Sequence, residues 1–546
     1  MGQGNGFDVG GEEFIQTLFI PPVDSPQLAS ILHLHLNMKP SLPLRLVVVS
    51  FALVTCLSAA PDYLQVTDFE SLQKLAQQLA RAPYEAPPAN LDPFYEGLKY
   101  DDHRQIRFIP EKALFTSPDD TFRVEFFHPG WMFKKPVGFF NLVPGKTEPI
   151  PFDTKLFDYG GVKVPANAAA PSGYAGFRIL APNSVADRRF EFLVFMGASY
   201  FRSVTTELGY GISARGVAVN TIGGEPEEFP DFTHFWIVPP AKDDKLFTCL
   251  ALLNGPSITG AYRFSTMPGK TTGMFVTGSL YVRKPVKMLG LAPFSSMFWY
   301  GENTHPKPYD FRPEVHDSDG LQIEVEGGPT LWRPLDNGRD MRLSFFEVPK
   351  LKGFGLGERD RDFKNFEDLE ANYHLRPAVW VEPIKGFGEG SVGLVELSTG
   401  EETWDNIVAF WQPKTIPTTP EEPLNFEYRL DWLEEHVPGL LAKVLATRRG
   451  FVMKSTTDHL YVVDFSRGLT DPAPPADWVP DVKVELTGGD KAEVLDARVM
   501  KNPETKGWRA FFQIRVPETS NLIEMSAELK QAEKTISEKW VYQWRR

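Results

Sequence analysis

Two clusters of acidic residues are the part of this sequence whose residue types could do chemistry. The first, DFRPEVHDSDG, spans residues 310–320 and places four carboxylates around a histidine, and the second, GEETWDN, spans residues 400–406. Breaking a glycosidic bond needs one carboxyl group that donates a proton and another that accepts one. Because 13% of the residues are aromatic and could pack on sugar rings, the clusters indicate sugar chemistry. The alternative is an ordinary turn rich in Asp, Ser and Gly.

The chain is too long for one hydrophobic core. Its 546 residues predict one large and one small domain, and 42% hydrophobic with 23% charged residues is typical of a soluble globular protein. The net charge of −14 disfavours a nucleic-acid partner, because phosphate binding depends on concentrated Lys and Arg. A neutral or anionic glucose polymer is compatible with that charge.

The two cysteines do not predict a disulfide or a metal site. Cys56 lies in a segment that we expect to be removed, and Cys249, in LFTCLALL, is expected to be a buried apolar strand residue rather than a nucleophile. No CxxC or HExxH pattern occurs, so we expect neither a metal nor another cofactor.

Residues 38–60 read as a secretory signal peptide. Lys39 and Arg45 precede an apolar run that ends in small residues, and no Arg-Arg pair precedes that run, which favours Sec export. The run is short for a membrane anchor. We expect Met38 to be the true initiator, with residues 1–37 a gene-start error, and the mature protein to act outside the inner membrane.

The mature chain is expected to be all-β after one helix. Residues 69–79 carry apolar positions at a helical period, and from about residue 101 short alternating runs separated by Gly, Pro and Asp predict antiparallel strands. We expect a large β-sandwich domain over 61–435, a linker over 436–445 and a small immunoglobulin-like β-sandwich over 446–546.

Several longer strings carry a family resemblance over about residues 64–546. Together, FHPGWMF, FMGASYFR, EEFPDFTHFW, SSMFWYGEN, RPEVHDSDGL, LWRPLDN and DNIVAFWQP resemble the periplasmic glucan biosynthesis proteins G and D. The lack of a twin-arginine signal favours the G type. The resemblance implies a galactose-mutarotase-like β-sandwich, an immunoglobulin-like domain, a periplasmic location and a role in making osmoregulated periplasmic glucans, whose backbone is β-1,2-linked glucose.

The same resemblance implies residue roles. Asp317, in HDSD, matches the general base of related anomer-inverting β-1,2-glucanases, and Asp405, in ETWDN, matches the general acid. Glu402 matches a position near the acid, while Tyr373 and Arg376 match positions beside bound sugar.

The chemistry requires the acid to stay protonated near neutral pH. An apolar or like-charged setting raises the pKa of a carboxyl group, and Trp404 with the run IVAF offers the first while Glu402 offers the second. His316, beside the proposed base, is either a catalytic support or a structural hydrogen-bond partner. We expect Asp310, Glu314 and Asp319 to serve turns and supporting contacts.

Aromatic and cationic side chains are candidates for holding the sugar. In a β-sandwich such aromatics are more often core residues, and we expect Trp404 and Trp411 to belong to that majority. Arg202 and Arg215 read as buried ion-pair partners for Asp231 or Glu228. The sugar-binding candidates besides Tyr373 and Arg376 are Trp236, Trp299, Tyr300, Trp332, Arg333 and Trp380.

Two functions stay open at this point. The first is an inverting endo-β-1,2-glucanase or related transglycosylase that processes the nascent glucan. The second is a non-catalytic glucan-binding scaffold that works with an inner-membrane glucan synthase. An aldose mutarotase is disfavoured because the His and Glu arrangement it needs is not apparent, and a homodimer is a further candidate assembly.

Overall fold

The computed structural model describes residues 62–87, 91–183, 189–222, 224–304, 309–437, 439, 441–468, 477–487 and 492–546. The predicted N-terminal extension, signal peptide and Cys56 therefore lie outside the described residues. In the described ranges no helix is both long and apolar enough to cross a membrane.

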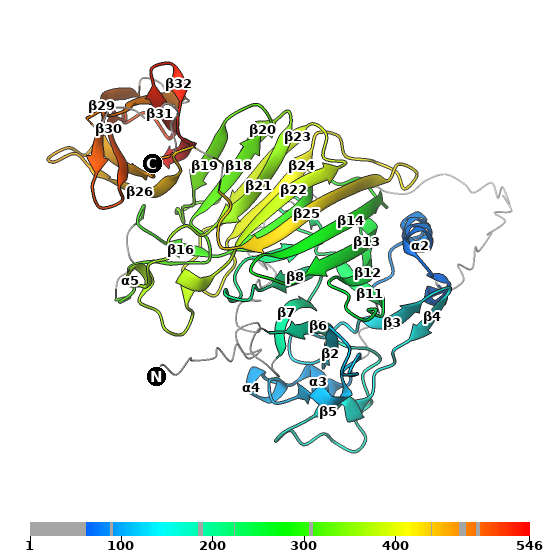
Figure 1. Cartoon of the computed structure of the whole chain (residues 1–546). Helices are drawn as coiled ribbons and strands as arrows, with labels where there is room; N and C mark the ends of the chain where they lie inside the picture. Colours follow the sequence, from blue (N-terminus) through cyan, green and yellow to red (C-terminus); the bar gives the residue numbers. More distant parts are fainter. Residues whose placement is uncertain are drawn as a thin grey trace, which may run out of the picture.

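The large sheet of the molecule is built from strands that run across the middle of Figure 1. In the part of this sheet that belongs to the large sandwich, neighbouring strands are antiparallel, except that β3 runs parallel to β11. Its order is β19 (Thr330–Pro334), β18 (Gly320–Val325), β21 (Leu351–Gly357), β22 (Ala378–Lys385), β25 (Leu424–Leu433), β14 (Thr272–Val282), β13 (Ile258–Met267), β12 (Phe247–Asn254), β11 (Asp231–Ile237), β3 (Gly138–Val143) and β4 (Lys146–Pro149).

A second sheet packs against the first through aromatic side chains. Phe195 of β7 contacts Phe264 of β13 with ring centroids 5.1 Å apart, and Phe294 of β15 contacts Phe354 of β21 at 5.7 Å. The expected all-β sandwich is confirmed. The order of the second sheet is β2 (Arg123–Phe127), β6 (Gly176–Pro182), β7 (Arg189–Met196), β8 (Tyr200–Ser203), β9 (Ser213–Arg215), β15 (Leu289–Ser296), β24 (Ile407–Pro413), β23 (Gly390–Glu396) and β20 (Arg342–Val348), with β10 (Ala218–Val219) beside β15.

Short elements complete the large sandwich. The predicted helix is α2 (Phe69–Arg81), whose apolar stripe packs with Trp236 and its neighbours on the outer face of β11 to β13. The hairpin of β16 and β17 follows β15 and leads to the first acidic cluster. The short elements are α3 (Pro93–Glu96), α4 (Tyr100–His103), β1 (Arg107–Phe108), β5 (Phe157–Asp158), β16 (Phe298–Tyr300), β17 (Val315–His316) and α5 (Phe363–Phe366).

The C-terminal strands enclose a core of their own, which includes Tyr461, Phe512 and Trp540. They lie at one end of the large sheet in Figure 1, and β33 pairs in parallel with β19. Their separate core supports our proposal of a second, immunoglobulin-like domain. One sheet holds β26 (Val444–Phe451), β27 (Asp458–Phe465), β30 (Gly507–Arg515) and β29 (Glu493–Asn502). The other strands continue the large sheet beyond β19, and they are β28 (Asp481–Thr487), β31 (Leu522–Gln531), β32 (Lys534–Thr535) and β33 (Lys539–Arg545).

The segment expected to be a linker ends in a strand. We expected a linker as far as residue 445, whereas β26 begins at Val444 and pairs with β27.

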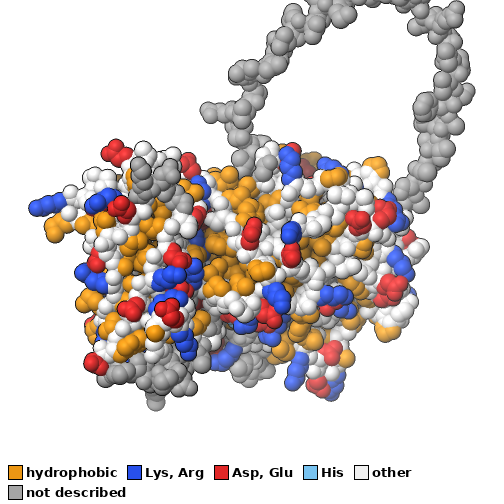
Figure 2. Space-filling view, turned by 90° about the horizontal axis from the view of Figure 1, so that it is seen from above, with side chains coloured by type: hydrophobic (Ala, Val, Ile, Leu, Met, Phe, Trp, Pro, Cys, Tyr) orange, Lys and Arg blue, Asp and Glu red, His pale blue; other side chains and the backbone are white. Residues whose placement is uncertain are grey.

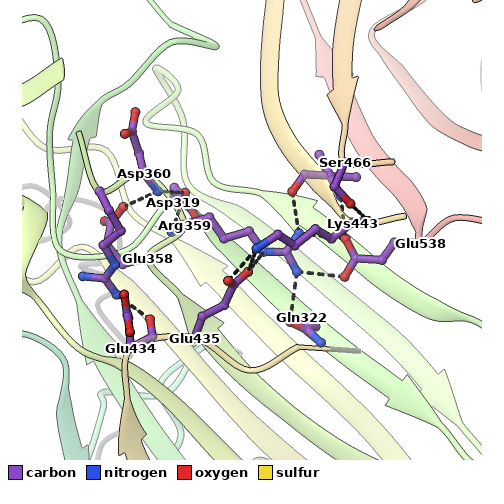
Figure 3. Close-up of polar contacts among 12 residues, drawn as sticks. Asp319, Gln322, Glu358, Arg359, Asp360, Glu434, Glu435, Lys443, Ser466 and Glu538 are labelled. Carbon is purple, nitrogen blue, oxygen red and sulfur yellow. Dashed lines mark hydrogen bonds and ion pairs between the residues drawn. The ribbon is translucent and has the colours of Figure 1, made fainter. Parts of the chain in front are cut away.

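Arg359 joins the two groups of strands (Figure 3). Its guanidinium donates to both carboxylate oxygens of Glu538 at 2.7 and 2.8 Å, and also to the Val444 carbonyl at 2.7 Å. The same guanidinium lies 3.5 Å above the ring centre of Trp332. Its own backbone amide donates to Asp319, a member of the first acidic cluster, at 2.9 Å. A buried, bidentate ion pair thus links the C-terminal strands to the segment that carries Asp319.

The face of the molecule in Figure 2 carries acidic and basic side chains intermixed, with apolar patches between them. This face therefore lacks the concentrated basic surface that nucleic-acid binding requires.

We predict that Glu538→Ala lowers the free energy of unfolding by about 3 to 5 kcal/mol, because it leaves the buried Arg359 guanidinium without its carboxylate. Urea denaturation followed by circular dichroism measures the change. The control is Glu389→Ala, which breaks an exposed 2.7 Å pair with Lys414 and should lower the stability far less than Glu538→Ala does. Equal stability of the two variants would contradict the prediction.

Candidate active site

The two expected catalytic carboxylates are anchored to one pair of neighbouring residues, Met297 and Phe298. The Asp317 amide donates a 2.8 Å hydrogen bond to the Met297 carbonyl. The Asn406 side chain accepts from the Phe298 amide at 2.8 Å and donates to the Phe298 carbonyl at 3.0 Å. Because Asp405 directly precedes Asn406, the turn from β15 to β16 brings Asp317 and Asp405 together, although they are far apart in the sequence.

The Asp405 carboxyl is buried beside an arginine. Its side chain is 4% exposed, and Nη2 of Arg202 lies 3.8 Å from Oδ2. Burial raises the pKa of Asp405 to about 6, and the charge of Asp317 acts in the same direction, while Arg202 and Arg215 oppose both. This is the setting that a general acid near neutral pH needs.

Asp317 is also buried, and it faces a different arginine. Nε of Arg376 lies 3.6 Å from Oδ1 of Asp317. Within the described part of the chain, neither carboxylate oxygen accepts a hydrogen bond from a protein group. Both oxygens can therefore accept a proton from a water or a sugar hydroxyl, as a general base must.

The other family positions cluster around this pair. The Arg376 guanidinium lies 5.3 Å from the ring centre of Tyr373, whose hydroxyl donates to Oε2 of Glu402 at 3.3 Å. Nη1 of Arg312 lies 2.5 Å from the same Glu402 oxygen. The structure thus brings Asp317, Tyr373, Arg376 and Glu402 into one contact network beside Asp405.

His316 is held in place by two glutamates. Its Nδ1 lies 2.8 Å from Glu358 and its Nε2 lies 3.0 Å from Glu314, and the imidazole stacks on Phe298. Burial alone would lower the pKa of His316, but the charges of Glu358 and Glu314 raise it well above the ordinary value. Because both ring nitrogens contact glutamates, His316 holds the segment that presents Asp317 in place. This favours a structural role for His316 over a catalytic one.

The remaining expected sugar contacts are buried and already contact protein groups. Trp332 and Trp380 have cationic or imidazole groups over a ring face, so that face is not open to a sugar. Tyr300 adjoins the network around Glu402. The other three candidates, Trp332, Arg333 and Trp380, lie elsewhere in the fold. The contacts are Trp332 with Arg359 at 3.5 Å, Trp380 stacked on His436 at 3.6 Å, Arg333 with Glu396 at 3.1 Å, and Tyr300 donating to the Arg312 carbonyl at 3.4 Å.

Trp236 and Trp299, also considered as platforms, differ from each other. Trp236 is fully buried under α2 and is a core residue, whereas Trp299 is only partly buried and packs against Tyr300. Trp411 is fully buried as expected, but the expectation for Trp404 was wrong, because its side chain is 41% exposed. Trp404 precedes β24 in a loop, so the alternation of that strand does not bury it.

The expected partners of two arginines were also wrong. Arg202 faces Asp405, and Arg215 pairs with Glu227 at 2.9 Å. Asp231 pairs instead with Lys135 at 2.7 Å.

Arg312 was missed as a functional residue although the sequence carried a signal for it. It is the cation within the first acidic cluster, and it pairs with Asp310, Asp368 and Glu402 at 2.5 to 2.9 Å. Its hydrogen bonds lower the pKa of Asp310 to about 2. Arg312 therefore organises the carboxylates that surround Tyr373 and Glu402.

In the described residues no group of three or more His, Cys, Asp and Glu side chains could hold a metal ion. Cys249 is fully buried in β12, and burial raises the pKa of its thiol well above the ordinary value, as expected of an inert apolar position.

Comparison with known proteins identifies the family. Residues 67–544 match the model described as "Periplasmic glucan biosynthesis protein, MdoG". The chain is 41% identical over 481 residues to glucans biosynthesis protein G of Pseudomonas paraeruginosa, covering 86% of this chain and 91% of the relative. It is 39% identical over 489 residues to the protein of the same name from Pseudomonas entomophila, covering 88% and 84%. The chain therefore belongs to the periplasmic glucan biosynthesis protein family MdoG.

Proposed function

We propose that this chain processes the backbone of a periplasmic glucan, as an inverting endo-β-1,2-glucanase or a related transglycosylase. The observation that carries the proposal is the burial of Asp317 and Asp405 beside each other, each facing its own arginine. The β-1,2 linkage comes from the family resemblance. We propose the periplasm as the location and an inner-membrane glucan synthase as a partner on the same basis.

In the proposed reaction Asp405 donates its proton to the glycosidic oxygen as the bond from that oxygen to the anomeric carbon breaks. Asp317 accepts a proton from the water whose oxygen attacks the anomeric carbon from the opposite face, which inverts the configuration. Where Asp317 does not touch that water, an ordered water or a sugar hydroxyl relays the proton. In a transglycosylase a sugar hydroxyl takes the place of the attacking water.

The neighbouring side chains have distinct proposed roles. Arg202 and Arg376 offset the two buried negative charges, so that neither carboxylate is buried without a cation. Tyr373 and Glu402 position the sugar through hydroxyl and carboxylate contacts. Trp404, directly before the acid and exposed, offers a flat face on which a glucose ring can pack.

The experiment is to incubate the mature protein with linear β-1,2-glucan and to follow the products by chromatography, for the wild type and for Asp405→Asn. The proposal expects cleavage or transfer by the wild type and a loss of at least about 1,000-fold in Asp405→Asn, because the proton donor is gone. Asp458→Asn, in the C-terminal strands, is the matched control and should retain activity.

Full activity of Asp405→Asn would remove this residue from the acid role. A wild type that binds the glucan but neither cleaves nor transfers it would favour the scaffold function instead.

The pH profile provides an independent prediction. Because only protonated Asp405 can donate, kcat/KM should fall about tenfold per pH unit above pH 6, the pKa set by burial. Arg202 lowers that pKa, so Arg202→Gln should move this alkaline limb to higher pH. Steady-state kinetics over about four pH units around pH 6 measure the alkaline limb of the wild type and of Arg202→Gln. An alkaline limb that stays at the same pH in Arg202→Gln would assign it to another group.

Asn406 is predicted to act as a positioning residue for Asp405. Its side chain bonds to Phe298 and Leu397, so Asn406→Ala should release the loop that carries the acid. We expect kcat to fall about 100-fold with little change in KM, since a displacement near 1 Å has that effect. Asn425→Ala, at an exposed position of β25, is the control. Equal kcat in the two variants would show that Asp405 needs no such anchor.

A further inference from the structure

A pocket of about 420 Å³, separate from the candidate active site, lies where the large sandwich meets the C-terminal strands. Its lining residues come from β16, from the segment that leads from β19 into β20, from β26 and from the end of β33. The pocket is unusual for a chain with a net charge of −14, because five arginines and two aspartates line it, which gives its side chains a formal charge of +3. The charged lining residues are Arg339, Arg342, Arg449, Arg545, Arg546, Asp336 and Asp340.

One of the arginines is neutralised by the protein itself. Asp336 is buried and pairs with Arg342 at 2.6 Å, and it also accepts from the Tyr542 hydroxyl at 3.3 Å. Arg449 lies 3.7 Å from the same carboxylate, beyond ordinary hydrogen-bond distance. Asp336 therefore fixes two guanidinium groups at the pocket wall but offsets only one of their charges.

Neutral acceptors orient two further arginines. Arg545 donates to the Gln543 side chain at 2.6 Å, and Arg546 donates to the backbone carbonyls of Ser520 and Pro517 at 3.2 and 3.0 Å. In the part of the chain that the structure describes, neither forms an ion pair with a carboxylate. Their positions are thus fixed without loss of positive charge, which is how proteins prepare a site for an oxyanion.

The pocket is connected to the candidate active site. Asn337, in its wall, donates to the carbonyls of Trp299 and Thr399 at 3.0 Å each and accepts from the Thr399 amide. Thr399 begins the loop that leads to Glu402, and Trp299, which also lines the pocket, is partly exposed. The pocket thus offers fixed cations together with an aromatic face, beside the place where the glucan is proposed to bind.

We propose that this pocket binds an anionic saccharide, with a phosphate or carboxylate group held by the arginines and the sugar ring against Trp299. Planar guanidinium groups match the oxygens of both kinds of anion. That the saccharide is part of the glucan itself rests on the proposed function. Anion binding at the pocket does not depend on it.

The test is calorimetric titration of the full chain, at constant ionic strength, with glucose 6-phosphate, glucuronate, glucose and inorganic phosphate. We expect at least one of the two anionic sugars to bind at least about tenfold more tightly than glucose, because its anionic group adds a charge-assisted contact. It should also bind at least about tenfold more tightly than inorganic phosphate, because its ring packs on Trp299. In Arg339→Gln/Arg449→Gln that affinity should fall at least about tenfold. Arg498→Gln, on exposed β29, is the matched control and should bind as the wild type does.

Anionic sugars that bind no more tightly than glucose, or with affinity unaffected by Arg339→Gln/Arg449→Gln, would overturn the inference. Inorganic phosphate bound as tightly as both sugars would overturn the saccharide assignment. Cleavage of neutral β-1,2-glucan is measured on the same samples, and it should be unchanged in Arg498→Gln. Cleavage without anion binding contradicts only the pocket, and anion binding without cleavage contradicts only the glucanase.

Discussion

The constraint on which the site depends is the burial of two carboxylates, Asp317 and Asp405, at one place. Two like charges in a low-dielectric interior destabilise each other. A separate arginine faces each carboxylate and partly offsets its charge. The balance is incomplete, because burial and the charge of Asp317 still raise the pKa of Asp405. The negative charge of Asp405, the proposed proton donor, is only partly offset by its arginine. The charge of Glu538, a structural carboxylate, is fully paired.

The position of Asp317 also depends on the C-terminal strands. His316 and Asp319 flank it, and they are held by Glu358 and by the amide of Arg359, two consecutive residues. The Arg359 side chain in turn is clamped by Glu538. The C-terminal strands thereby support the segment that presents the proposed base, in addition to lining the proposed anion pocket.

The sequence predicted what depends on local pattern or on recognisable motifs. The apolar period gave α2, the alternation gave the strands, and the strings around Asp317 and Asp405 gave the carboxylate pair. It did not predict what depends on sheet order. Arg202 reaches Asp405 because β8 neighbours β9, which pairs with β15, which pairs with β24. No local signal encodes that path, so nearby acidic residues were taken as its partners.

The anomeric configuration of the first product tests the central claim most directly, because it reports the geometry of the two carboxylates and not only their presence. Proton NMR of linear β-1,2-glucan, recorded from the moment the enzyme is added, follows the reducing ends before mutarotation equilibrates them. An acid and a base on opposite faces of the sugar predict the α-anomer first. The β-anomer as first product would contradict the roles given to Asp405 and Asp317.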